Sequence, residues 1–115
     1  MPRWRPIGMS RAQIIAEDGQ DCVLRLVGRC VMPADTAPVV GTNEPHSLSL
    51  DHIMEQAHHG PNHHPSNLIT VHRMCNTVRG SRPFLKFVGK DNARLLARYA
   101  PRVAPTIRRC FSGTC

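Results

Sequence analysis

The residues whose types and spacing predict chemistry are Asp51, His52, Asn67 and Asn76. Asp51 and His52 are adjacent, fourteen residues separate His52 from Asn67, and eight separate Asn67 from Asn76. A histidine with its usual pKa of about 6.5 is mostly neutral at neutral pH and can accept a proton from water. Carboxylate and amide oxygens are hard ligands that suit Mg²⁺. A base beside a divalent cation is what hydrolysis of a phosphate ester requires.

Each of these residues falls at a junction between predicted elements. Residues 47–53 alternate apolar and polar side chains, which predicts a half-buried strand that ends at Asp51 and His52. Residues 54–66 are rich in glycine, proline and histidine and predict a loop, residues 68–72 predict a second strand, and residues 72–80 predict a helix. Neighbouring side chains of a regular strand point to opposite faces. The first strand must therefore twist at its end, or the cation must lie at its edge.

Taken singly, these residues have ordinary structural explanations. An Asp-His pair at a strand end can hydrogen-bond a turn, and asparagine is common in turns and caps. Their joint occurrence at this spacing favours a functional interpretation.

The segments around these residues resemble the HNH nuclease family, which has a ββα-metal centre. The resemblance covers residues 47–83 well and residues 10–33 loosely. It is carried by Ser49-Leu50-Asp51-His52-Ile53, Gly60, Ser66-Asn67-Leu68, His72-Arg73-Met74-Cys75-Asn76 and Arg79-Gly80. Each motif is common alone, but the set is specific. The resemblance implies a small single-domain α+β fold with a ββα-metal centre and flanking helices. A structural zinc ion could stabilise this fold.

The resemblance also implies roles for particular residues. His52 is the expected general base, and Asp51 and Asn76 are expected to hold one divalent cation, Mg²⁺ or Mn²⁺. Asn67 is expected to brace the loop that orients His52, and Arg79 to contact the phosphate. The implied reaction is hydrolysis of DNA phosphodiester bonds that leaves 5′-phosphate and 3′-hydroxyl ends.

Relatives in this family commonly carry a structural zinc held by two pairs of cysteine or histidine. His72 and Cys75 supply the second pair at ordinary ligand spacing. The first pair is irregular, because Arg25 stands where Cys22-x-x-Cys would need a cysteine and arginine cannot ligate. Cys30, on a widened loop, would complete a site of Cys22, Cys30, His72 and Cys75. The alternative is that zinc is lost and the cysteines are buried as small apolar residues.

The charge balance favours a polyanionic partner. Fifteen lysines and arginines against eight acidic residues leave a net charge of +7, and DNA is the expected partner. Arg94 and Arg98 lie four residues apart on a helix predicted to start at Asp91 and to end at Tyr99. Such a run is by default a solvated face, but in a nuclease it would track backbone phosphates. No separate recognition module is visible, so strong sequence specificity would need a protein partner. The oligomeric state stays open.

A chain of 115 residues predicts one domain. We expect an N-terminal arm and helix over residues 1–20, capped at Ser10, then a nuclease core over residues 21–90 with a strand-like segment at 22–27. A C-terminal basic helix and mobile tail would fill residues 91–115. Five cysteines favour metal ligation or free thiols before disulfides. The absence of a recognisable secretory signal and of a membrane-spanning stretch predicts a cytoplasmic protein without a membrane partner.

Two other functions stay open. One is a catalytically inactive, basic DNA-binding module with an HNH-like fold, and the other is a zinc-stabilised interaction domain with no nucleic-acid role. Neither requires Asp51, His52 and Asn76 together, so these residues favour the endonuclease. The paired histidines His58-His59 and His63-His64 are weaker candidates for a metal or phosphate role.

Overall fold

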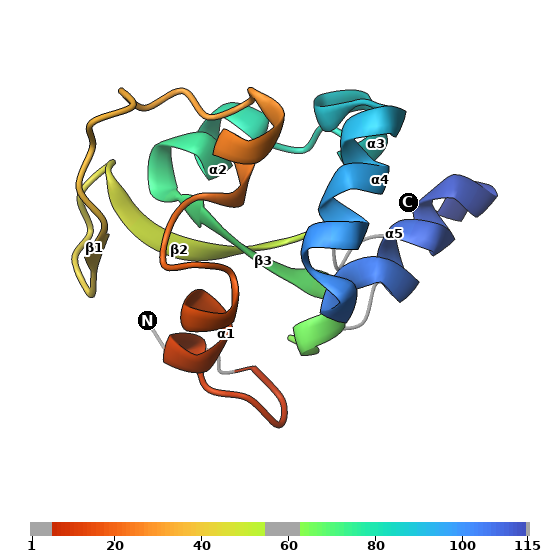
Figure 1. Ribbon diagram of the computed structural model, residues 1–115, viewed down its shortest axis with the longest axis horizontal. Helices are drawn as coiled ribbons and strands as arrows, with labels where there is room; N and C mark the ends of the chain where they lie inside the picture. The colour runs from red at the N-terminus through yellow and green to blue at the C-terminus, as the bar shows by residue number, and fades with distance from the viewer. Residues whose placement is uncertain (1–5, 55–62, 115) are drawn as a thin grey trace.

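A three-stranded sheet lies at the centre of the protein (Figure 1). The computed structural model describes residues 6–54 and 63–114. The strands are β1 (Val39–Val40), β2 (Ser47–His52) and β3 (Leu68–His72), in that order across the sheet. β1 runs parallel to β2, and β2 is antiparallel to β3 with His52 opposite Leu68 and Leu48 opposite His72. This register brings the end of β2 beside the start of β3, as the predicted strands required.

The first helix, α1 (Arg11–Glu17), begins where its sequence predicts. The Ser10 side chain accepts a hydrogen bond from the backbone of Gln13, and the Gln13 side chain accepts one from the backbone N–H of Ser10. This reciprocal capping box satisfies two donors at the helix start. Ile14 and Ile15 are buried, and the helix packs against β2 and β3. The prediction of this helix is confirmed.

Residues 22–27 form a 3₁₀ helix, η1 (Val23–Val27), so the prediction of a strand there is wrong. Val23, Leu24 and Val27 are buried on one side of this turn, whereas a strand would have alternated them between two faces. Gly28 ends the turn in the left-handed region at φ 69°. A short run of apolar residues does not distinguish a strand from a buried helical turn, and packing against β3 and α4 decided the matter.

The helix predicted over 72–80 is present as α2 (Arg73–Arg79), and it packs against β2 and β3. Pro83 precedes a further short helix, α3 (Phe84–Val88), that was not predicted. The predicted basic helix is α4 (Lys90–Tyr99), which follows Gly89 and ends before Pro101.

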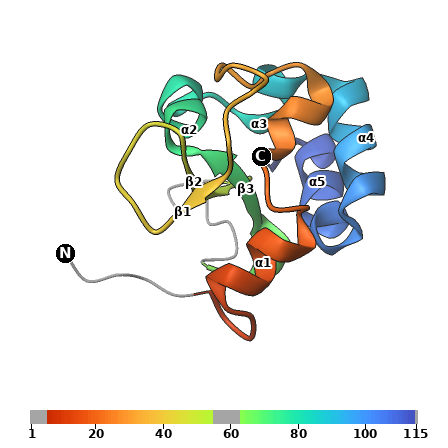
Figure 2. The ribbon, with the colours of Figure 1, turned by 60° about the vertical axis from the view of Figure 1, so that its left-hand side comes forward.

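The C-terminal segment is not the mobile tail that was expected. After Pro101 the chain forms η4 (Pro101–Val103), α5 (Ala104–Arg109) and η5 (Cys110–Thr114). α4 and α5 pack side by side at one end of the sheet (Figures 1 and 2). Cys110 is 3% exposed and disulfide-bonded, against the expectation of free thiols. The apolar side chains of α5 supply the burial that keeps this segment ordered.

A buried ionic group joins α1 to the C-terminal half. Asp18, at the end of α1, accepts hydrogen bonds from the backbone N–H and hydroxyl of Thr70 on β3 at 2.9 and 2.8 Å. The same oxygen accepts from Arg102 at 3.2 Å, and Arg102 also donates to the carbonyl oxygens of Pro65 and Leu68. The chain is thus a small α+β protein in which helices cover a short sheet, as predicted. No helix among residues 6–54 and 63–114 has the length and apolarity to cross a membrane.

Candidate nuclease and metal sites

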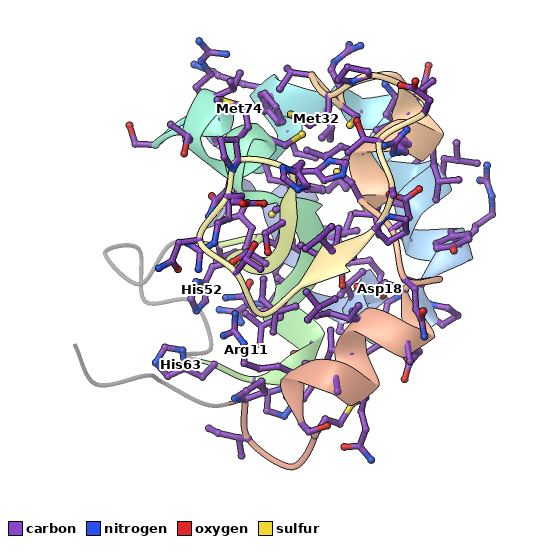
Figure 3. All side chains as sticks on the ribbon, turned by 90° about the vertical axis from the view of Figure 1, so that its left-hand side faces the viewer. Arg11, Asp18, Met32, His52, His63 and Met74 are labelled. Atoms are coloured by element: carbon purple, nitrogen blue, oxygen red, sulfur yellow. The ribbon has the colours of Figure 1, made fainter. Side chains whose placement is uncertain are left out.

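A cavity of about 790 Å³ lies between α1, residues 41–43, β2 and the start of α2. Asp51 and His52 from the end of β2 line this cavity together with half-buried Asn76 from α2. The two neighbouring residues of β2 therefore border one space, although their side chains would diverge in an untwisted strand. Figure 3 shows His52 on the same side of the molecule as Arg11.

Arg79 is an internal anchor for the end of β2, and it does not lie on the surface where a phosphate contact was expected. The residue is 3% exposed. Its guanidinium donates to a carboxylate oxygen of Asp51 at 2.7 Å and to the carbonyl oxygens of His52 at 2.6 Å and Ile53 at 2.8 Å. A planar guanidinium offers several donors in a fixed arrangement, which suits this bracket. Arg79 therefore fixes the two residues that border the cavity.

Asn67 holds the chain immediately after β2. Its side-chain oxygen accepts from the backbone N–H of Met54 at 2.8 Å, and its side-chain nitrogen donates to the Met54 carbonyl at 2.9 Å. Its own backbone carbonyl accepts from Ile53 at 2.9 Å. The side chain is fully buried. These bonds tie the segment that follows His52 to the start of β3.

The imidazole of His52 lies beside a second imidazole. Nε2 of His52 is 3.3 Å from Nδ1 of His63, and the ring centroids are 5.3 Å apart (Figure 3). Burial, the neighbouring His63 and the Arg79 guanidinium all lower the pKa of His52 below its usual 6.5. Each of these disfavours the imidazolium cation, by desolvation or by charge repulsion. His52 is therefore neutral at neutral pH and able to accept a proton.

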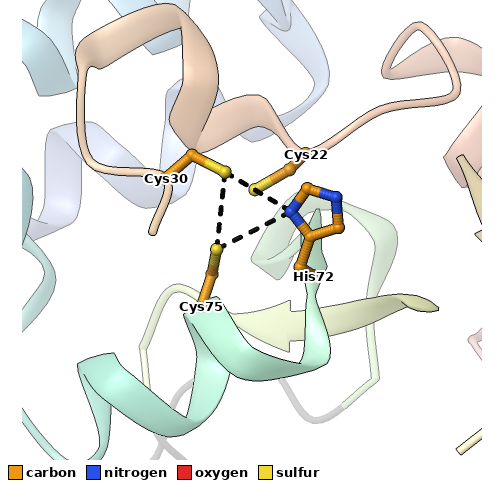
Figure 4. A group of neighbouring side chains, drawn as sticks. All are labelled: Cys22, Cys30, His72 and Cys75. Carbon is orange, nitrogen blue, oxygen red and sulfur yellow. Dashed lines mark hydrogen bonds between the residues drawn. The ribbon is translucent and has the colours of Figure 1, made fainter. Parts of the chain in front are cut away.

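A second cluster consists of Cys22, Cys30, His72 and Cys75, and one ligand atom from each lies within 4.8 Å of the others (Figure 4). Nδ1 of His72 is 3.4 Å from the Cys30 sulfur and 3.7 Å from the Cys75 sulfur. The two sulfurs are 3.6 Å apart. Cys22 precedes η1, Cys30 follows it, and the other two residues come from the junction of β3 and α2. The structure thus brings together all four residues that sequence spacing nominated.

The chemistry of this cluster fits a zinc ion. Three thiols and one imidazole are a common tetrahedral donor set. A hydrogen bond from Cys22 lowers the pKa of Cys75 to about 4, and the same bond raises the pKa of Cys22. Burial raises the pKa of Cys30. Because zinc binds thiolates, metal binding would release protons from the thiols that are still protonated.

The remaining sequence candidates lie away from the cavity. Arg94 is exposed on α4, where it pairs with Asp91 at 3.0 Å and its guanidinium carbon lies 4.8 Å from the centre of the Phe111 ring. Arg98 is exposed on the same helix, and neither arginine lines the cavity. His64 accepts from the backbone of Ser66 and so caps a short turn. His58 and His59 lie outside the described residues.

Two cavity residues were not found by sequence reasoning. Arg11 begins α1 and Arg73 begins α2, and both line the cavity with His52. A basic residue at the start of a helix is too common to indicate a site. Only the packing of the two helices against β2 brings these side chains to one cavity.

Comparison with known proteins agrees with the geometry. Residues 37–82 match the family model described as HNH endonuclease. No curated protein and no solved structure matched the chain. The matched segment contains β2, β3 and α2 with all the cavity residues except those of α1, and it begins after Cys22 and Cys30. Residues 37–82 of this chain therefore match the HNH endonuclease family, in agreement with the family that the sequence resembles.

Proposed function

We propose that this chain is an endonuclease that hydrolyses DNA phosphodiester bonds with the help of one divalent cation. One observation carries this proposal. Asp51 and His52, at the end of β2, line the same cavity as Asn76, which lies far along the chain on α2. The HNH domain supplies the nuclease class, and the net charge of +7 suits a polyanionic substrate. Specificity for a DNA sequence would come from a protein partner.

His52 is the proposed general base. Its neutral imidazole would take a proton from the water that attacks phosphorus, a kind of assistance typically worth about 10²–10⁴-fold. Arg79 and Asn67 hold the backbone of His52 and of the two residues that follow it through the bonds described above. They are positioning residues, because they set where the imidazole lies without touching the substrate.

Asp51 and Asn76 would hold the divalent cation. A carboxylate and a side-chain carbonyl are hard oxygen donors of the kind that Mg²⁺ and Mn²⁺ prefer. When bound, such a cation supplies charge stabilisation to the phosphate and to the departing oxygen. Arg79 already contacts one oxygen of Asp51 and so fixes the orientation of the carboxylate.

Cys22, Cys30, His72 and Cys75 would hold a structural zinc ion. The site would join η1 and its following loop to the start of α2, which carries Asn76. Structural zinc contributes on the order of 10 kcal/mol to the folding of small domains. This ion would hold the helix of the catalytic cavity in place and take no part in hydrolysis.

The test is cleavage of supercoiled plasmid by the full chain with Mg²⁺ or Mn²⁺. Wild-type protein should nick or cut the plasmid, and a chelator should abolish cleavage. His52→Ala should lose cleavage and still bind DNA, while His46→Ala serves as a matched control because His46 pairs with Glu44 outside the cavity. Cleavage by His52→Ala at the wild-type rate would refute the assigned base. DNA binding without cleavage in any metal would instead support an inactive binding module.

A further inference from the structure

Arg25 occupies the position at which a Cys-x-x-Cys pair would place its second cysteine. Its guanidinium makes four hydrogen bonds. Nε donates to a carboxylate oxygen of Asp21 at 3.1 Å, and the two terminal nitrogens donate to the carbonyl oxygens of Ala34, Pro33 and Thr36 at 2.9, 3.2 and 3.3 Å. The Arg25 side chain is 19% exposed. A solvated arginine makes fewer hydrogen bonds within the protein, so these four indicate that Arg25 has a structural role.

The three carbonyls belong to the segment that follows Cys30. Residues 33–36 form a turn outside the helices and strands, in which the Thr36 N–H donates to the Pro33 carbonyl at 3.0 Å, and the carbonyls of the turn need further partners. Arg25 supplies those partners from η1 and thereby closes the loop between Cys22 and Thr36. Cys30 lies inside this closed loop, with its sulfur 3.4 Å from Nδ1 of His72.

Asp21 lies on the other side of the same histidine. Its Oδ1 accepts from the backbone N–H of Cys22 at 2.7 Å and from Arg25, and it is 4.0 Å from Nε2 of His72. His72 is completely buried, and among the described residues its Nε2 has no hydrogen-bond partner. A buried polar atom without a partner is costly and calls for an explanation.

A metal ion explains this arrangement. Nδ1 of His72 faces the sulfurs of Cys30 and Cys75, so a metal bound there would leave the ring proton on Nε2. Histidine ligands commonly donate that proton to a carboxylate, which fixes the ring and raises its basicity. Asp21 is the carboxylate already held at this point.

We propose that Asp21 and Arg25 form the outer shell of the metal site. With the metal bound, His72 and Asp21 would close the present 4.0 Å so that Asp21 accepts the Nε2–H of His72, and Arg25 holds both Asp21 and the loop that presents Cys30. Position 25, which carries arginine in place of a cysteine ligand, thus still serves the site. Arg25 organises the loop that presents Cys30, the proposed replacement ligand. This inference rests on the proposed zinc site at Cys22, Cys30, His72 and Cys75.

The competing explanation is an ordinary helical ion pair. Asp21 and Arg25 are four residues apart, and an exposed pair at this spacing contributes about 0.3–0.5 kcal/mol and nothing to metal binding. The two explanations differ in what they predict for zinc affinity.

The experiment measures the zinc affinity of the full chain by competition with a chromophoric chelator. Asp21→Asn and Arg25→Ala should each weaken zinc binding by about 10–100-fold, the usual effect of an outer-shell partner. Arg25→Lys should bind zinc as weakly as Arg25→Ala, because a single ammonium cannot reach three carbonyls and a carboxylate together. Two matched controls should bind zinc as wild type does. Asp91→Asn removes an exposed acid that pairs with Arg94, and Arg29→Ala removes an exposed arginine with one bond to the Phe87 carbonyl.

A proton NMR measurement provides a second readout. The zinc-loaded wild type should show a slowly exchanging Nε2 proton from His72, and Asp21→Ala, which has no side-chain acceptor, should lose that protection. This readout does not depend on whether Arg25→Ala folds. Zinc binding at wild-type affinity by both variants would overturn the outer-shell assignment alone. Failure of the wild-type chain to take up zinc would overturn the metal site itself and this inference with it, while plasmid cleavage tests the nuclease separately.

Discussion

Replacing Arg79 should destabilise the protein more than any exposed arginine does. The Arg79 guanidinium is 3% exposed and faces Asp51, whose side chain is 14% exposed. Arg79→Met keeps a long apolar stem over the Phe84 ring, from which the guanidinium carbon lies 5.6 Å. It removes the charge partner of Asp51 and the donor to the backbone carbonyls of His52, Ile53 and Arg82.

The expected loss follows from the burial of these groups. Removing one partner of a buried, hydrogen-bonded ion pair costs about 3–5 kcal/mol. The free energy of unfolding of a small domain is about 5–15 kcal/mol, so the variant loses a large share of its stability. With an unfolding entropy of about 2.1 cal/mol/K per residue, 1 kcal/mol corresponds to about 4 °C in a chain of this length. The melting temperature should therefore fall by about 12–20 °C.

The assay is urea denaturation and thermal melting of the full chain, with Arg98→Ala as the exposed control. A double-mutant cycle with Asp51→Asn separates the ion pair from the three carbonyl bonds, because the coupling energy isolates the pairwise contact. Arg79→Lys should recover only part of the loss, since an ammonium cannot reproduce the three-way contact. A free energy of unfolding for Arg79→Met within about 1 kcal/mol of wild type would refute the argument that this buried bracket holds the strand end.

Three further predictions concern the site and its supports. Because the neutral form of His52 is the active one and its pKa is lowered from 6.5, the acid limb of kcat/KM should be centred below pH 6.5; an acid limb centred above pH 6.5 would contradict this. Asn67→Ala should cost about 1–3 kcal/mol in urea denaturation, because the Met54 backbone loses two buried partners, and should also slow plasmid cleavage; an unchanged cleavage rate would remove its positioning role. Asp18→Ala should cost about 3–5 kcal/mol because it leaves Arg102, 9% exposed, without its buried partner; loss of less than about 1 kcal/mol would show that the pair contributes little.

Local patterns predicted the elements whose cause is local. Ser10 and Gln13 cap α1 with their own side chains, and alternation over residues 47–52 follows from one buried face of β2. η1 was mistaken for a strand because its apolar residues fit either element. The order of the C-terminal segment was missed because Pro101 ends α4 without ending the fold.

The residue types and spacing of this chain by themselves predicted the match to the HNH family, nominated Asp51, His52 and Asn76, which line one cavity, and nominated the four candidate zinc ligands. These depend on which donors exist and how far apart they lie along the chain. Only the tertiary structure decided that Arg79 points inward to Asp51 while Arg25 takes up the carbonyls beside Cys30. The charge and length of an arginine side chain are the same whether the residue is exposed on the surface or buried among several acceptors. Its role is set by the acceptors that packing brings to it from distant parts of the chain.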